Sequence, residues 1–320
     1  MELIPVFVYS ELWPCEVPQG SILSPLLFLV FINDFPDCSN FFKFTLFADD
    51  STLTCTIDKS TYNSANFVVD GELEKVYSWL KANQLQLNTS KSTYLVFSGR
   101  KAFSLPSIHL NGVALNQSEN TKFLGLIVDK NLKFSTHITQ IKAKLSKSVG
   151  IIHKLKHILP YPALLTIYQS LVVPYISYAI EIWHGAPKYL INQIFILQKK
   201  AIRAINLLPY NSHTNNYFKE AKLLKLEELF KSYSCSHIYQ AMHSENHFLR
   251  AHLKTHHEIS NLNTRNSSNL MLPLCKKAQT KAGFMFTAIK EWNTLPSNVK
   301  CAKTIFSFKS KIKNYYLSQY

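Results

Sequence analysis

Two adjacent carboxylates, Asp49 and Asp50, lie within the apolar stretch 44–53 of the sequence. Apolar residues lead up to the pair and a β-branched, hydroxyl-bearing run follows it. This pattern predicts a strand, a tight turn and a second strand. Neighbouring acids in such a hairpin repel each other and lose hydration unless a cation lies beside them, and Mg²⁺ binds carboxylate oxygens while keeping some of its waters. The pair therefore indicates a Mg²⁺ site. The alternative is a surface turn, in which aspartate is common.

The charge of the 320-residue chain is divided unevenly along the sequence. Residues 1–125 contain 8 Lys and Arg against 12 Asp and Glu, whereas residues 126–320 contain 27 against 8. The net charges are therefore −4 and +19, which together give the +15 of the whole chain. Carboxylates that hold cations beside a region that attracts phosphate suit an enzyme of nucleic-acid chemistry. A positive surplus of this size exceeds what solubility requires.

Four sequence blocks surround and include the acid pair in a fixed order. They are residues 17–28, which contain Pro-Gln-Gly, then residues 47–50, 88–93 and 123–129. Their order and spacing resemble the second half of the palm of a reverse transcriptase, of the type found in jockey-like non-LTR retrotransposons (LINEs). The resemblance implies an RNA-directed DNA polymerase that uses an RNA template, a DNA primer and deoxynucleoside triphosphates. It also implies Mg²⁺ as the cofactor, with Mn²⁺ as an alternative.

The resemblance assigns roles to residues near the nucleotide. Pro18, Gln19 and Gly20 would lie under the incoming nucleotide and the template base. A helix-entry turn is the simpler reading of Gly20, and a turn and a site can coexist there. Lys91 would lie near the triphosphate, against the alternative of a solvated turn lysine.

The last block implies a primer grip. Residues 123–128 read as one strand, and Phe123, Leu124 and Gly125 would hold the primer terminus mainly through their backbone. A strand core is the competing interpretation of the first two residues.

The metal site that the resemblance implies needs carboxylates from two palm strands. Asp49 would be a direct ligand and Asp50 a ligand or its partner, while a further aspartate is expected on a strand upstream of Val17. The only acidic residues in 1–16 are glutamates, and this segment contains no motif that we assign. We therefore expect the chain to lack polymerase activity on its own and its sheet to have an unpaired edge. A non-catalytic nucleic-acid-binding remnant is the alternative function.

Apolar spacing predicts the helices. Residues 25–35 read as a buried helix and residues 62–80 as an amphipathic one, with Phe67 and Val68 on its apolar stripe. Asn-Gly at 111–112 predicts a hairpin over residues 108–115.

Three further helices, over residues 134–157, 162–183 with a kink at Pro174, and 192–207, suit a thumb that lies along a duplex. We expect five lysines of the first to contact the nucleic-acid backbone, although ordinary solvated helix faces would also carry lysines: Lys142, Lys144, Lys147, Lys154 and Lys156.

The predicted fold is therefore α+β, a partial palm sheet with packed helices followed by a helical thumb and tail. The domains would be an unassigned segment 1–16, a partial palm 17–130, a thumb 131–210 and a basic C-terminal region 211–320. Histidines in 235–257 allow a zinc site, against the alternative of a polar surface. A metal-binding structural protein is accordingly a third, weaker reading of the function.

Bulk properties restrict the compartment. The six cysteines form no Cys-x-x-Cys pair, which suits a reducing environment. We see no secretory signal and no apolar run of the length that a membrane span needs. The expectation is a nuclear or cytoplasmic protein without membrane contact, and its oligomeric state stays open.

Overall fold

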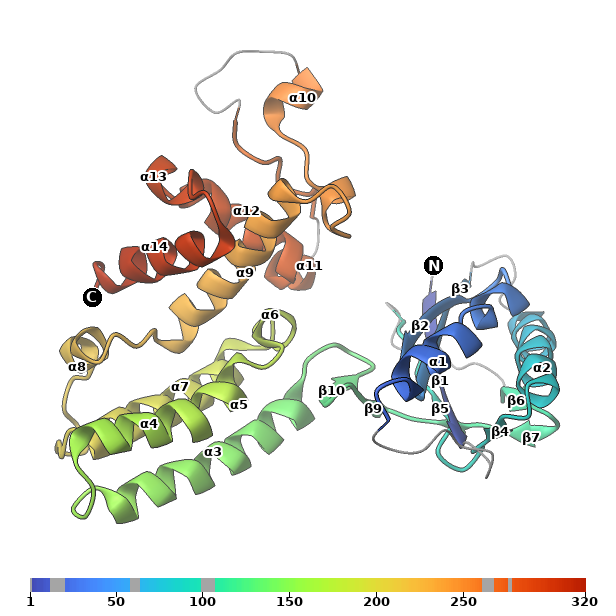
Figure 1. Ribbon diagram of the computed structural model, residues 1–320, viewed down its shortest axis with the longest axis horizontal. Helices are drawn as coiled ribbons and strands as arrows, with labels where there is room; N and C mark the ends of the chain where they lie inside the picture. Colours follow the sequence, from blue (N-terminus) through green and yellow to red (C-terminus); the bar gives the residue numbers. More distant parts are fainter. Residues whose placement is uncertain (1, 12–20, 58–63, 99–106, 261–267, 276–277) are drawn as a thin grey trace. The chain divides into compact units, whose positions relative to one another are not determined.

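The computed structural model describes residues 2–11, 21–57, 64–98, 107–260, 268–275 and 278–320. The chain divides into an N-terminal unit, Met1–Leu132, and a C-terminal unit, Lys133–Tyr320. The first unit carries a net charge of −4 and the second +19, so the change of charge along the sequence falls at the boundary between the units. Strands gather in the first unit and helices make up the second (Figure 1), which agrees with the predicted α+β class.

One sheet forms the centre of the N-terminal unit. Its strand order is β2-β3-β1-β5-β8, and β4 also pairs with β1. The strands are β1 (Glu2–Glu11), β2 (Lys43–Phe47), β3 (Asp50–Ile57), β4 (Gln86–Leu87), β5 (Thr93–Tyr94) and β8 (Asn116–Gln117). Every pairing is antiparallel except that of β5 with β8.

Among the described strands, β2 and β8 end the sheet, so its open edges do not lie beside β3. Strand β1 pairs with β3 in eight consecutive positions, from Glu2 opposite Ile57 to Tyr9 opposite Asp50. Residues that we left unassigned thus form a central strand. Pro5 lies in its middle, opposite Thr54, where a residue without an N–H group is uncommon.

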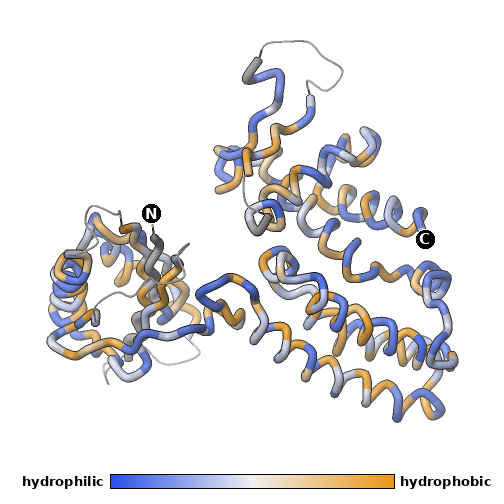
Figure 2. Tube along the Cα trace, turned by 180° about the vertical axis from the view of Figure 1, so that it is seen from behind, coloured by the Kyte–Doolittle hydropathy of each residue, from blue (hydrophilic) through white to orange (hydrophobic). Residues whose placement is uncertain are grey.

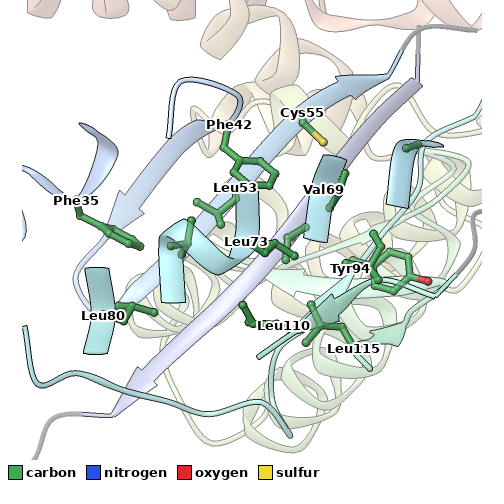
Figure 3. Packing of buried hydrophobic residues seen from close by; sticks show 14 of the residues in the cluster. Phe35, Phe42, Leu53, Cys55, Val69, Leu73, Leu80, Tyr94, Leu110 and Leu115 are labelled. Atoms are coloured by element: carbon green, nitrogen blue, oxygen red, sulfur yellow. The ribbon is translucent and has the colours of Figure 1, made fainter. Parts of the chain in front are cut away.

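One face of this sheet packs on α2 (Ala65–Ala82), as Figure 3 shows for Leu53, Cys55, Val69 and Leu73. Side chains at every second position of β3 and at spacings of three and four on α2 meet there, which is the periodicity that the sequence predicted. The apolar stripe predicted for this helix included two residues too many, however. Phe67 is 76% exposed and Val68 is 42% exposed.

The prediction of a buried helix after the Pro-Gln-Gly block is wrong in its burial. Helix α1 (Ser24–Phe31) forms with Pro25 in its first turn, but none of its eight residues is buried. Leu29 is 62% exposed and Val30 is 71% exposed. A helix that is apolar on every side can turn only one side toward its own core. On that side, Phe28 packs against the apolar cluster of the sheet and α2. The chain then continues into η1 (Phe35–Cys38).

Two small hairpins complete the unit. Strands β6 (His109–Leu110) and β7 (Val113–Ala114) confirm the Asn-Gly turn, because Asn111 and Gly112 have φ of 51° and 71°. Residues 123–128 do not form the single strand that we predicted. They belong to the hairpin of β9 (Asn120–Phe123) and β10 (Leu126–Asp129), because Leu124 and Gly125 adopt positive φ and reverse the chain.

The C-terminal unit begins with a group of packed helices. These are α3 (Ser135–Leu155), α4 (Tyr161–Leu171), α5 (Val173–Ser177), α6 (Ile180–Trp183) and α7 (Lys188–Ile205). The single kinked helix predicted for 162–183 is in fact three helices. The chain breaks at Val172, directly before the proline-containing turn, and again at Ala179, whose φ is 50°.

Helix α9 organises the rest of this unit. It packs against α12 and α14 around a second apolar core that includes Ile238, Trp292 and Phe308. The remaining helices are α8 (Asn215–Glu220), α9 (Leu226–His243), η3 (Arg250–His252), α10 (His256–Ser260), α11 (Ala278–Ala282), α12 (Phe284–Thr294), α13 (Ser297–Lys300) and α14 (Ile305–Leu317). Hydrophobic and hydrophilic positions alternate along these helices (Figure 2), as one-sided burial requires. Among the described residues, no helix is both long and apolar enough to cross a bilayer.

Candidate functional site

The acid pair lies where the sequence predicted it, at the turn between β2 and β3. Phe47 pairs with Asp50, so Ala48 and Asp49 form the two-residue connection. Ala48 has a φ of 50°, which is uncommon for a residue with a Cβ atom and marks local strain. Asp49 is exposed and Asp50 is half-buried. The hairpin therefore presents two carboxylates at one edge of the sheet, with one of them open to solvent.

The electrostatics of the pair suit a cation. Burial and the negative charge of Asp49 raise the pKa of Asp50, and the positive charge of Lys122 on β9 offsets part of that shift. A raised pKa means that ionising this carboxyl group costs more free energy than it does in water, and a bound cation would offset that cost. The donor atoms are hard oxygens, and the exposure of Asp49 leaves room for the waters that Mg²⁺ retains. The residues present thus fit a divalent cation, although no group of three or more His, Cys, Asp or Glu residues gathers within the described ranges.

This electrostatic arrangement predicts the effect of removing one charge. We expect Asp50→Asn to raise the melting temperature at pH 7 in the absence of divalent cations. The folded state of the original chain holds a proton on Asp50 more tightly than the unfolded state does. Its stability therefore falls as the pH rises from the ordinary aspartate pKa to the raised pKa of the folded state, and the loss is complete above both. The difference should vanish below the ordinary aspartate pKa of about 3.9. Adding Mg²⁺ should stabilise the original chain and narrow the gap.

Calorimetry at several pH values measures this difference. Asp34→Asn, which changes an exposed aspartate of the same unit, is the matched control. It keeps the acid pair, so Mg²⁺ should stabilise it as much as it stabilises the original chain. An Asp50→Asn variant that melts below the original chain at pH 7 would show that the pair is stabilised without a cation, as in an ordinary turn.

Strand β1 brings a further acidic residue close to the hairpin in register. Tyr9 lies opposite Asp50, and Glu11, two residues later, ends the strand opposite Gln86 of β4. Sequence reasoning missed this placement. The apolar and aromatic run 3–9 is the signal that could have revealed a strand, although proline, here Pro5, is uncommon in the middle of one.

Of the residues assigned to nucleotide binding, only Lys91 lies within the described part of the chain. Pro18, Gln19 and Gly20 lie outside the described residues. Lys91 is exposed in the turn between β4 and β5, where its backbone N–H donates to the Asn88 side chain at 3.1 Å. The structure thus places Lys91 on a tight turn of the N-terminal unit and leaves its role as a prediction.

The residues assigned to the primer grip form the tip of the β9–β10 hairpin. Phe123 and Leu124 are half-buried, and Gly125 is exposed with a φ of 83°. Lys122 directly precedes this tip and acts electrostatically on Asp50. Lys122 therefore lies close enough to Asp50 to act on its charge, a relation that residue spacing did not reveal.

The five lysines of the first helix in the C-terminal unit differ in their surroundings. The Lys142 ammonium donates to the Gln193 side chain of α7 at 2.9 Å, and that of Lys144 lies 5.5 Å from the centre of the Tyr175 ring. Lys147 and Lys154 are exposed and seven residues apart, so they share one face of α3. Lys156 is half-buried just after the helix ends. Lys147 and Lys154 are thus the best placed to meet a phosphate backbone.

The histidine-rich segment does not gather into a metal site within its described part. His243 stacks on the ring of Tyr239, with 4.1 Å between centroids, and its Nδ1 lies 2.8 Å from the Tyr239 carbonyl oxygen. His237 instead pairs with Glu181 of α6 through Nε2 and Oε1, 3.1 Å apart. These contacts give the two side chains structural partners.

Comparisons with known proteins agree with the site in the N-terminal unit. Residues 13–128 match the family described as reverse transcriptase (RNA-dependent DNA polymerase). The chain is 30% identical over 220 residues, 66% of its length, to the RNA-directed DNA polymerase from mobile element jockey of Drosophila melanogaster. It is 30% identical over 227 residues to the probable RNA-directed DNA polymerase from transposon BS, and 29% identical over 214 residues to that from transposon X-element, both of the same fly. These alignments cover 66% and 65% of the chain. The aligned part spans about a quarter of the length of each relative, 24%, 24% and 23%.

Proposed function

The chain carries a segment of the reverse transcriptase family of non-LTR mobile elements, and we propose that it serves RNA-directed DNA polymerisation as the second half of the catalytic core. Residues 17–130 would form part of the palm, residues 131–210 the thumb and residues 211–320 a basic C-terminal region. Its substrates would be an RNA template, a DNA primer and deoxynucleoside triphosphates, and it would act in the nucleus or the cytoplasm.

The observation that carries this proposal is the strained, solvent-open turn with Asp49 and Asp50. Both carboxylates would hold divalent cations, Mg²⁺ or alternatively Mn²⁺, and Asp49 would be the direct ligand. When bound, such cations activate the primer hydroxyl and neutralise the triphosphate. Lys122 of β9 acts on the charge of Asp50 and would supply positive charge for the phosphates of a primer strand, while the β9–β10 tip at Phe123, Leu124 and Gly125 would supply backbone contacts. Pro18, Gln19, Gly20 and Lys91 would contact the nucleotide and template.

The C-terminal unit would supply affinity for the duplex. Its net charge of +19 attracts phosphates over a distance set by the ionic strength. The exposed face of α3 with Lys147 and Lys154 would lie along the backbone, and Lys142, Lys144 and Lys156 would flank it.

We expect these 320 residues by themselves to bind a primer–template but not to extend it. A site for two cations needs carboxylates from two separate segments of the palm sheet. The β2–β3 hairpin, with Asp49 and Asp50, is only one such segment. Primer extension on an RNA template with Mg²⁺ tests this, with Asp49→Ala as the control. No extension, together with salt-sensitive duplex binding, is the expected result. Extension that disappears in Asp49→Ala would overturn the expectation of inactivity. Glu11→Gln would then test whether Glu11 completes the site.

The second candidate function is a nucleic-acid-binding protein without chemistry. The observation that favours it is that the basic helices and the acid pair lie in different units, so binding can persist where catalysis is absent. Joining the upstream palm segment of a related mobile-element polymerase to this chain separates the two functions. Restored extension that depends on Asp49 supports the polymerase, and binding without extension supports the remnant.

A further inference from the structure

A cleft of about 820 Å³ opens on the C-terminal unit, and no lysine of α3 lines it. Helices α4, α5 and α6 line one side, and α9 and α14 line the other, with the segment before α9 between them. The volume lies in the range of binding sites for molecules the size of a few joined rings.

Two tyrosines provide flat aromatic surfaces in the cleft. Tyr178, between α5 and α6, is 53% exposed, and Tyr233 on α9 is 40% exposed. Both therefore leave part of their surface accessible within the lining of the cleft. Exposed aromatic rings in a concave site are the usual stacking surfaces for unpaired nucleic-acid bases, because every base has a flat π face.

Hydrogen-bonding side chains also line the cleft. The Glu181 side chain is only 13% exposed and its Oε1 is 3.1 Å from Nε2 of His237, which is 40% exposed. Gln169 and Gln240 also line the cleft. Carboxylate, amide and imidazole groups are those that bind the edges of bases, and a carboxylate accepts hydrogen bonds from the amino groups that some bases carry.

Three exposed lysines complete the cleft. Lys309 and Lys313 are four residues apart on α14 and therefore lie on one face of that helix. Lys222 contributes from the segment that precedes α9 and has a left-handed backbone with φ of 52°. Three ammonium groups beside aromatic surfaces complement a ligand that joins flat rings to a chain of phosphates.

We propose that this cleft binds a single-stranded polynucleotide, with unpaired bases on Tyr178 and Tyr233, base edges at Glu181 and phosphates at Lys222, Lys309 and Lys313. A duplex does not fit this chemistry, because its bases are already stacked and paired. The inference deepens the proposed function by naming the unpaired part of the nucleic acid as the ligand of the C-terminal unit.

Fluorescence anisotropy with labelled 12-nucleotide strands of RNA and of DNA tests the stacking and phosphate contacts on the full chain. Tyr178→Leu and Tyr233→Leu should each weaken binding about tenfold, the effect of losing one stacked base. Lys309→Gln with Lys313→Gln should reduce the slope of log affinity against log salt by about 1.4, as expected for two phosphates of a single strand.

Matched controls lie outside the cleft. Tyr189→Leu removes a tyrosine that is 64% exposed on α7, and Lys311→Gln removes a lysine of α14 whose ammonium donates to the Asn298 carbonyl. Neither should change binding by more than about twofold. Unchanged melting temperatures establish that all variants are folded. Cleft variants that bind like the controls would overturn the proposal, and a comparison of the RNA and DNA strands shows which of them the site prefers.

Two further measurements report on the cleft directly. RNA with 4-thiouridine should photocrosslink to the α9 peptide that contains Tyr233, and crosslinks confined to α3 or α7 would contradict the proposal. Glu181→Gln should change the relative affinities for oligo(C) and oligo(U), because only cytosine donates an amino group. Equal ratios in both proteins would show that Glu181 does not contact bases.

Failure of this inference is separable from failure of the proposed function. Cleft variants should keep their affinity for an RNA–DNA duplex, whereas substitutions on α3 should weaken duplex binding and spare single strands. If one variant loses affinity for both the duplex and the single strand, one surface binds both ligands and the assignment of single strands to the cleft is wrong.

Discussion

Replacing Gln198 by leucine should lower the free energy of unfolding of the C-terminal unit by about 4 kcal/mol. Gln198 lies on α7 and is 1% exposed. Its amide nitrogen donates to the Tyr168 hydroxyl and to the Leu224 carbonyl, both at 3.0 Å, and its oxygen accepts from the Leu226 N–H at 2.9 Å. One side chain thus joins α7, α4 and the start of α9.

The size of the effect follows from the partners that remain. Leucine is similar in shape but leaves a hydroxyl, a carbonyl and an N–H without this bond. Each buried group that loses its partner costs about 1–3 kcal/mol, and three groups in one network add to several kcal/mol. The loss should appear as a lower midpoint of urea unfolding, followed by circular dichroism of the helices.

The control is Gln193→Leu, five residues earlier on α7, where the side chain accepts one bond from Lys142 at the surface. Its effect should stay within about 0.5 kcal/mol. If Gln198→Leu lowers the free energy of unfolding no more than the control does, then water or a shift of α9 provides new hydrogen-bond partners for the hydroxyl, the carbonyl and the N–H group.

Reversing two charges on α3 should weaken binding of an RNA–DNA duplex about 100-fold at 0.1 M salt. Each phosphate contact releases counterions and contributes close to tenfold in affinity at this salt concentration. Lys147 and Lys154 share one exposed face of α3, so Lys147→Glu with Lys154→Glu removes both contacts and adds repulsion. Filter binding over a series of salt concentrations measures the affinity and its slope.

Lys290→Glu with Lys311→Glu gives the matched control. It changes the net charge by the same amount on exposed positions of α12 and α14. If both double variants lose equal affinity, the duplex responds to total charge and α3 is not its binding face. A loss confined to the α3 variant, with a lower salt slope, supports the thumb assignment.

Local patterns predicted several elements from the residues alone. The acid pair occupies its turn, Asn111 and Gly112 form their hairpin, and the apolar spacing of α2, α3 and α7 produced helices near the expected limits. In each case the information lies within a few residues, since turn chemistry and helical periodicity depend on near neighbours. The division of charge, too, was visible in the sequence and coincides with the division into two units.

The misplaced features depend on distant partners. Strand β1 was unassigned because residues 1–16 show no motif and no clear apolar period, and its pairing with β3, over forty residues away, decides its conformation. Helix α1 is apolar on all sides, and composition cannot tell which side finds a partner. Leu124 looked like strand core, but its φ of 45° places it in a turn.

Residue types and their spacing along the chain therefore determined the kind of chemistry, an acid pair for cations beside a basic region for phosphates. Only the tertiary structure decided which groups meet. It placed Lys122 close enough to act on Asp50, tied three segments to Gln198, and formed one cleft from α5, α9 and α14. The physical reason is that side-chain patterns act over a few residues, whereas burial and pairing are settled by contacts between segments that the sequence holds far apart.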